Sequence, residues 1–227
     1  MKFKAFTAGV AGLAFGAALG VAGQAAATVY IQVQTAGYNG GVAKEVASDP
    51  DTASITNATY GSFTVANLTG TVGFGPGLLA SDTIDKRKGT KGVGVLKLWV
   101  TLTGVSSPLG NLEWTSGFTE NLLPKGWTVL EETLVSTSDA KYAGTVLSSY
   151  TFTTNGAQSF VKSFNTGSGP YSVTEYYQIT APTANLSEST ISLSAVPEPG
   201  AWALMLIGVG GLGLALRRSR VRAVRAI

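Results

Sequence analysis

Apolar and polar residues alternate along several stretches of the chain, most clearly over residues 95–103, VLKLWVTLT. One face of this stretch holds Leu96, Leu98, Val100 and Leu102. The opposite face holds Lys97, Trp99, Thr101 and Thr103. A period of two places successive side chains on opposite faces, so the pattern predicts a β-strand with one buried face.

The same alternation recurs between Thr28 and Val196, separated by Gly, Asn and Pro turn signals such as Asn39-Gly40-Gly41. It groups Val29, Ile31 and Val33, then Phe63 and Val65, then Tyr171, Val173, Tyr177 and Ile179, and finally Ile191, Leu193 and Ala195. About eight short strands at this spacing predict an all-β fold, an antiparallel β-sandwich. Jelly-roll and immunoglobulin-like topologies both fit. Residues 43–54 and 81–92 are charged and contain Gly or Pro, so we expect solvated loops there.

The C-terminal end has a different pattern. Residues 201–216 carry no charge, and Arg217, Arg218 and Arg220 follow. A helix over this run is about 24 Å long, which suits a short transmembrane span with the arginines on the cytoplasmic side. The alternative is a helix buried in the domain core, but the run lacks the polar face that such a helix would show.

The N-terminal end reads as a secretory signal peptide over residues 1–27. Lys2 and Lys4 precede an apolar stretch, and Ala25 and Ala27 provide the small residues that a signal peptidase accepts. Cleavage after Ala27 would make Thr28 the first residue of the mature chain. The alternative is an uncleaved anchor helix. The Sec machinery and signal peptidase are therefore expected partners.

The C-terminal residues resemble a known sorting signal. Pro197-Glu198-Pro199, followed by Trp202-Ala203, the apolar span and the arginine cluster, resembles the PEPxxWA variant of the PEP-CTERM tail. The resemblance divides the chain into a body over 28–196, a sorting tail over 197–220 and a basic extension over 221–227. It implies a Gram-negative bacterium and an exosortase that cuts near the Pro-Glu-Pro. The body would face the periplasm while the tail is anchored in the inner membrane, and would then pass to the cell surface or extracellular matrix. Whether the mature form keeps its C-terminal helix stays open.

Charge and composition exclude several classes of function. Of the sixteen basic residues, only nine lie in the body, which holds twelve of the thirteen acids. Nucleic-acid binding is therefore not expected, because the phosphate-neutralising lysines and arginines are missing. Histidine and cysteine are absent, which removes the Ser-His-Asp and Cys-His nucleophiles and the commonest zinc ligands. We expect no cofactor.

Catalysis would then fall to carboxylates, as in glycoside hydrolysis. The candidates are Glu113, Glu120, Glu131, Glu132 and Glu175. Glu131 and Glu132 are adjacent and point to opposite faces of a strand, so they cannot form a catalytic pair. Glu175 shares a face with Val173 and Tyr177, and could be a buried acid with a raised pKa. An edge strand or a salt bridge is the favoured explanation. We expect no enzyme.

Binding sites for ions are weakly indicated. Asp49-Pro50-Asp51, and Asp82 with Asp85, offer oxygen ligands that suit calcium, but neither matches a calcium-binding loop. A turn is the favoured interpretation of Asp-Pro-Asp, and we expect no metal. The basic run at 86–88, with Lys91, could recognise an acidic polysaccharide, although a solvated loop is favoured.

Aromatic residues supply the remaining candidate site. Trp99 and Tyr176 both lie opposite the apolar stripe of their own strands, where a sugar-stacking ring would sit. Packing in the core or at its rim is the competing explanation. The sequence thus predicts an exported, non-enzymatic protein with a structural or adhesive role associated with exopolysaccharide or biofilm. The alternative is a carbohydrate-binding module or a glycan-active enzyme at the cell surface.

Overall fold

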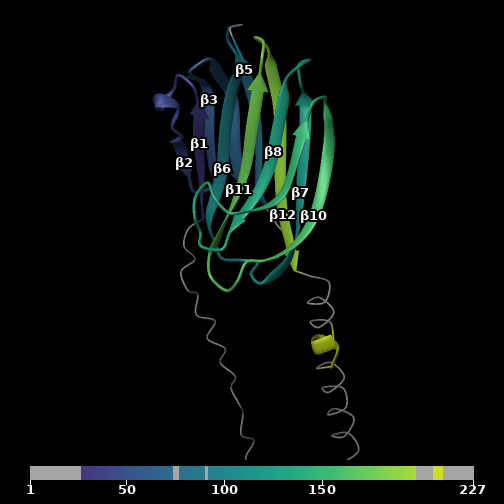
Figure 1. Cartoon of the computed structure of the whole chain (residues 1–227). Helices are drawn as coiled ribbons and strands as arrows, with labels where there is room; N and C mark the ends of the chain where they lie inside the picture. The colour runs from purple at the N-terminus through teal and green to yellow at the C-terminus, as the bar shows by residue number, and fades with distance from the viewer. Residues whose placement is uncertain (1–26, 74–76, 90–91, 198–206, 212–227) are drawn as a thin grey trace, which may run out of the picture.

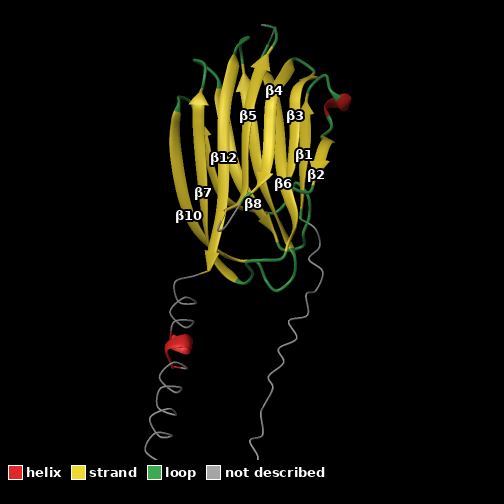
Figure 2. Ribbon diagram, turned by 180° about the vertical axis from the view of Figure 1, so that it is seen from behind, coloured by secondary structure: helices red, strands yellow, loops and turns green. Residues whose placement is uncertain are grey.

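The computed structural model describes residues 27–73, 77–89, 92–197 and 207–211. These residues form twelve strands in two antiparallel six-stranded sheets, packed face to face. The all-β sandwich predicted from the alternation is confirmed. Figures 1 and 2 show the two sheets from opposite sides.

Sheet A has the order β2-β1-β6-β11-β8-β9, and sheet B has the order β10-β7-β12-β5-β4-β3. The strands of sheet A are β2 (Lys44–Asp49), β1 (Thr28–Thr35), β6 (Gly94–Val105), β11 (Tyr171–Ala181), β8 (Thr128–Ser136) and β9 (Thr145–Phe152). The strands of sheet B are β10 (Gly156–Asn165), β7 (Asn111–Leu122), β12 (Leu186–Pro197), β5 (Gly77–Arg87), β4 (Phe63–Val72) and β3 (Thr52–Tyr60). One 3-10 turn, η1 (Asn39–Gly41), follows β1.

The last eight strands have the connectivity of a jelly roll. The order β6-β11-β8-β9 in one sheet faces β10-β7-β12-β5 in the other, so most connections cross between the sheets. The first four strands extend this unit, because β1 and β2 add to the free side of β6 while β4 and β3 add to the free side of β5.

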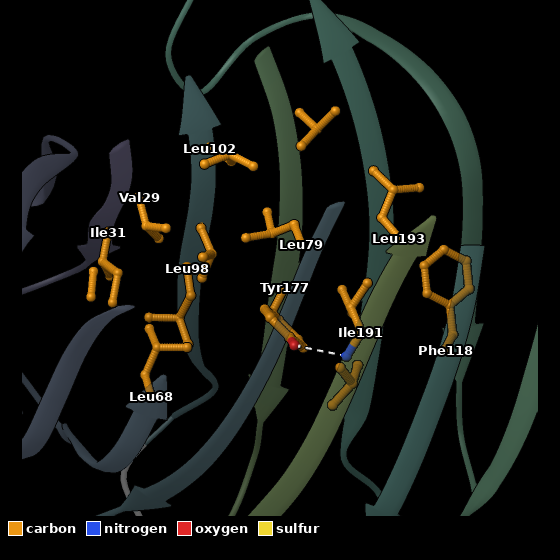
Figure 3. Close-up of a cluster of buried hydrophobic side chains, with 14 of the residues drawn as sticks. Val29, Ile31, Leu68, Leu79, Leu98, Leu102, Phe118, Tyr177, Ile191 and Leu193 are labelled. Atoms are coloured by element: carbon orange, nitrogen blue, oxygen red, sulfur yellow. Dashed lines mark hydrogen bonds between the residues drawn. The ribbon is translucent and has the colours of Figure 1, made fainter. Parts of the chain in front are cut away.

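The predicted apolar stripes form the core between the sheets. Leu96, Leu98 and Val100 of β6 are fully buried, as are Ile191 of β12 and Tyr177 of β11. Figure 3 shows Leu98, Tyr177 and Ile191 among the side chains that point into this interior. Gly70 on β4 allows the sheets to approach, because a Cβ at this position would lie 2.2 Å from Cγ1 of Val100.

Two segments predicted as loops are strands. Residues 43–54 contain the edge strand β2, a tight turn and the start of β3. Residues 81–92 contain most of β5, which lies between β12 and β4 in the middle of sheet B. The prediction was wrong because the inward residues of β5 are polar, namely Ser81, Thr83, Asp85 and Arg87, and all are buried.

The sandwich has two distinct ends. β1 begins and β12 ends at the same end, which we call the proximal end (Figure 1). The opposite, distal end carries the connections that leave β1, β3, β5, β7, β9 and β11. The chain therefore continues toward its sorting tail from the proximal end.

Candidate functional site

An aromatic pair lies on the outer face of sheet A. Trp99 of β6 and Tyr176 of β11 are directly opposite each other in the register. Their ring centroids are 5.0 Å apart, with an interplanar angle of 39°. Tyr176 is only 8% exposed and donates a hydrogen bond to Oε1 of Gln178 at 3.1 Å, whereas Trp99 remains half-buried. The indole is therefore the ring of this pair that faces solvent.

Polar side chains flank this pair along and across the strands. Gln32 of β1 is paired with Trp99, and Glu132 of β8 is paired with Tyr176. One step toward the distal end, the register aligns Gln34, Lys97 and Gln178. We call these seven residues the aromatic platform. Amide, ammonium and carboxylate groups around a planar ring can bind the hydroxyl groups of a sugar stacked on that ring.

The loop between β8 and β9 closes the proximal side of the platform. Oδ1 of Asp139 in this loop accepts a hydrogen bond from the backbone N–H of Gly104 at 2.8 Å. Nζ of Lys141 lies 3.5 Å from the ring centroid of Tyr30 and 3.1 Å from Oε2 of Glu45. These contacts hold the loop against β1, β2 and β6, so the platform opens toward the distal end.

Two hollows adjoin the distal side of the platform. The smaller has a volume of about 200 Å³ and is lined by Gln34, Thr35, Ala36, Gly41, Val95 and Lys97. The larger has a volume of about 590 Å³, within the range of small-molecule sites, and shares Thr35, Ala36 and Val95 with the first. Its other walls include Ser62, Lys88 and Val93.

The interior holds a second polar feature, which we call the buried carboxyl cluster. It comprises Glu131 and Glu175 from sheet A and Asp85 and Glu120 from sheet B, all between 0% and 1% exposed. Three of them accept hydrogen bonds from hydroxyl groups. Ser81 Oγ donates to Oε2 of Glu175 at 2.5 Å, Ser189 Oγ to Oε2 of Glu120 at 2.6 Å, and Thr83 Oγ1 to Oδ2 of Asp85 at 2.8 Å.

Burial raises the pKa of every carboxyl in this cluster. The pKa of Asp85 rises to about 8 and that of Glu120 to about 7, in both cases chiefly through desolvation. Desolvation, with repulsion from Glu120 and Glu175, raises the pKa of Glu131 to about 9. Desolvation raises the pKa of Glu175 well above its ordinary value. Asp85, Glu131 and Glu175 are therefore mostly protonated at neutral pH, and Glu120 is protonated in part.

The structure buries three of the five carboxylates that were considered for catalysis and separates the other two. Glu120, Glu131 and Glu175 lie inside the sandwich, while Glu113 and Glu132 lie on the outer faces of opposite sheets. The favoured explanation of Glu175 was wrong. It lies on a central strand, between β6 and β8, and it is bound by a serine hydroxyl across the sheets.

The calcium candidates do not converge either. Oδ1 of Asp49 accepts hydrogen bonds from the backbone N–H groups of Asp51 and Thr52, both at 2.9 Å, which closes the predicted turn. Asp82 accepts a hydrogen bond from Asn67 on the outer face of sheet B, whereas Asp85 points into the core. The described part of the chain contains no group of three or more acidic side chains arranged to hold a metal ion.

The predicted sorting residues lie mostly outside the described residues. Pro197 is the last residue of β12, while Glu198, Pro199, Trp202, Ala203, Arg217, Arg218 and Arg220 are not among the described positions. Residues 207–211 are helical. Within the described ranges, no helix is both long and apolar enough to cross a membrane, so the transmembrane helix stays a prediction.

The predicted signal peptide also falls almost entirely outside the described residues, Ala25 included. The described chain starts at Ala27, and β1 begins at Thr28, the residue that the predicted cleavage would expose. The cleavage itself stays a prediction.

Some solved structures resemble the fold at low scores. Tailspike protein 4 of bacteriophage CBA120, in its enzymatically active domain, has a TM-score of 0.36 and 7% identity, covering 73% of this chain and 19% of that one. The structure of the Gx strain of infectious bursal disease virus has a TM-score of 0.27 and 14% identity, covering 75% of this chain and 51% of that one. The VP2 subviral particle of the same virus has a TM-score of 0.27 and 12% identity, covering 74% of this chain and 56% of that one. This chain thus spans less than two thirds of each protein, and scores this low carry no inference about function.

No curated protein matches the sequence. A family model described as the PEP-CTERM protein-sorting motif matches residues 195–220. This range covers Pro197-Glu198-Pro199, Trp202-Ala203, the apolar run and the first arginines, in agreement with the resemblance stated from the sequence. Such a motif belongs to exported proteins of Gram-negative bacteria that an exosortase processes. The chain therefore carries a PEP-CTERM protein-sorting motif at residues 195–220.

Proposed function

We propose that the body of this exported protein binds polysaccharide through the aromatic platform and acts as a non-enzymatic structural or adhesive component of the surface matrix. The observation that carries the proposal is the half-buried Trp99, which packs beside Tyr176 of the neighbouring strand and is flanked by amide side chains on the outer face of sheet A. A flat aromatic ring offers an apolar surface to the C–H face of a pyranose, while neighbouring amides bind its hydroxyl groups.

The position of the carboxylates supports a binding role without catalysis. A glycosidase needs two carboxyl groups on either side of the scissile bond, separated by roughly 5 to 10 Å and open to substrate. Here Glu120, Glu131 and Glu175 are sealed between the sheets. Glu132 is on the platform, where its Oε1 accepts a hydrogen bond from Ser149 at 2.9 Å.

Replacement of the platform ring tests the binding role. In Trp99→Ala we expect the affinity of the purified mature protein for the producer's own exopolysaccharide to fall about tenfold, because about 1.4 kcal/mol of ring stacking is lost. Isothermal titration calorimetry with polysaccharide of defined chain length measures this change. Trp99→Phe, which keeps a planar ring, should retain most of the affinity.

Thr115→Ala is the matched control, because Thr115 lies on the outer face of sheet B. Equal affinities in the Trp99→Ala and Thr115→Ala variants, or no binding by the unmodified protein, would overturn the proposal.

We further propose that the tail crosses the inner membrane once and is cut by the exosortase. The uncharged run over 201–216, followed by Arg217, places the Pro-Glu-Pro on the periplasmic side, where the protease acts. We expect mass spectrometry of the protein recovered from the cell surface to give a C-terminus near Pro199. A surface-recovered chain that ends at Ile227 would contradict processing and indicate a permanent anchor.

A further inference from the structure

We propose that the polysaccharide bound by the aromatic platform is acidic, and that Lys97 and Lys88 bind its carboxylate groups along the two distal hollows. This inference rests on the proposed function, because it specifies the substrate class of the same site. It would hold the glycan along the strand direction, from Trp99 toward the distal end, since the loop between β8 and β9 closes the other direction.

The charge distribution along the sandwich supports an anionic partner at the distal end. Lys86 lies near the end of β5, with the buried Arg87 next to it and the exposed Lys88 directly after the strand, and Lys97 follows near the start of β6. Lys125 lies in the distal connection between β7 and β8. The proximal end carries Asp49, Asp51, Glu113 and Asp139 against two lysines, Lys141 and Lys162, while the distal end has one further surface acid, Glu188. The body is therefore electrically asymmetric, although its overall composition is acidic.

The buried carboxyl cluster strengthens this asymmetry. Asp85 and Glu120 lie toward the distal ends of β5 and β7, close in sequence and in space to the distal lysines. Both are buried, Asp85 is mostly protonated and Glu120 is protonated in part, so they cancel less of the positive charge at the surface than two ionised carboxylates would. A formal count of acidic residues in the sequence treats these two buried carboxyl groups as fully charged and therefore overstates the negative charge near the distal end.

Lys97 is placed to bind an anion next to the stacking ring. It lines the smaller hollow, one cross-strand row from Trp99, and its side-chain ammonium forms no hydrogen bond or ion pair with any residue in the described ranges. Glu45 and Glu132, the acids near the platform, are already engaged by Lys141 and Ser149 respectively. A carboxylate on the glycan would supply the partner that the protein does not.

The larger hollow continues the same path around the end of β1. Of the described residues that line the two hollows, none is acidic, and the exposed Lys88 lies in the larger one. Val93 is 66% exposed and Val95 is 36% exposed at its wall. Apolar side chains beside lysines suit a uronic acid, whose ring has an apolar C–H face and whose substituent is a carboxylate.

The test compares one polysaccharide with and without its charge. The probe is the producer's exopolysaccharide, used natively and after chemical reduction of its carboxyl groups to alcohols, with the purified mature protein. We expect reduction to weaken binding about tenfold or more, and Lys97→Gln to weaken binding of the native form about tenfold. Lys97→Gln should weaken binding of the reduced form much less, because the amide of glutamine can still bind hydroxyl groups. Binding of the native form should weaken as salt rises, and Lys88→Gln should lessen that dependence.

Lys97→Arg and Lys162→Gln serve as controls. The first keeps the charge and should restore binding, while the second removes a lysine from β10, on the other sheet. Thermal melting confirms that each variant is folded. If binding requires Trp99 but is unaffected by carboxyl reduction or by Lys97→Gln, this inference fails and the proposed function stands. If the native polysaccharide does not bind at all, both fail.

Discussion

Raising the pH from 5 to 7 should lower the free energy of unfolding by at least about 3 kcal/mol. The cause is the buried carboxyl cluster. In the unfolded chain these groups have ordinary pKa values near 4 and are ionised over this range. In the folded protein burial keeps most of their protons bound, because their pKa values lie at about 8 for Asp85, about 7 for Glu120 and about 9 for Glu131, and well above the ordinary value for Glu175.

The direction of the change follows from proton linkage. A group with a raised folded-state pKa contributes its full stabilisation below the unfolded pKa, and that contribution is lost as the pH rises toward the folded pKa. Each such carboxyl lowers stability by about 1.4 kcal/mol per pH unit within that window. The slope of unfolding free energy against pH therefore counts the carboxyls that stay protonated. Stability should continue to fall up to about pH 9, where Glu131 ionises.

Urea unfolding at a series of pH values measures this slope. Glu131→Gln replaces the acid with a neutral group of similar shape, so it should reduce the slope by about 1.4 kcal/mol per pH unit and stabilise the protein at pH 7. Glu113→Gln is the matched control on the outer face of sheet B and should leave the slope unchanged. A stability that is flat or rising between pH 5 and pH 7 would show that the cluster is not buried and protonated.

The second large effect is expected from Tyr177→Phe, which should destabilise the fold by about 2 to 3 kcal/mol. The Tyr177 hydroxyl joins the two sheets. It donates to the backbone carbonyl of Ser81 at 2.9 Å and accepts from the backbone N–H of Ile191 at 3.0 Å, the contact drawn in Figure 3. It also lies 2.9 Å from Oγ of Ser81. Its loss removes hydrogen bonds from a buried N–H and a buried C=O, and weaker hydrogen bonding of polar groups in a dry core is costly.

Tyr171→Phe provides the comparison for this variant. Tyr171 lies on the same strand and is equally buried, but its hydroxyl has no hydrogen-bond partner among the described residues. Removal of that hydroxyl should be neutral or slightly stabilising. Thermal and chemical unfolding of both variants at pH 5 compare them directly, with the cluster fully protonated. Equal destabilisation by the two substitutions would contradict the role of Tyr177 in joining the sheets.

The sequence predicted the strands whose inward residues are apolar. The alternation around Leu98 in β6 and around Ile31 in β1 is complete, so burial of one face is evident without any partner. The prediction from alternation failed for β5, because the inward face of this strand consists of polar residues, namely Ser81, Thr83, Asp85 and Arg87. Polar residues at alternate positions are buried there because hydroxyls and carboxyls on neighbouring strands satisfy one another, and the sequence of one strand does not contain its partners.

The candidate site was likewise predicted in part from the sequence and decided in part by the packing of strands. Trp99 and Tyr176 were each placed opposite their apolar stripes from the sequence, and the paired strands bring the two rings together. Their unequal exposure depends on how the rings pack. In the sequence, the acids of the buried carboxyl cluster were separate candidates for catalysis or calcium binding. Glu175 carried one indication of burial, because it shares a face with Val173 and Tyr177.

The sequence alone determined the sorting tail and the class of fold, because both depend on local patterns. The Pro-Glu-Pro tripeptide, the apolar run and the arginine cluster follow one another in the sequence. A strand with one buried face is recognised from the alternation of apolar and polar residues within its own sequence. The tertiary structure decided which residues separated by tens of positions share an environment. Ser81 meets Glu175, and Trp99 meets Tyr176, through pairing between strands far apart in the chain. Burial, charge state and the binding face follow from those long-range pairings, since solvent exclusion is a property of the packed sheets and not of any single strand.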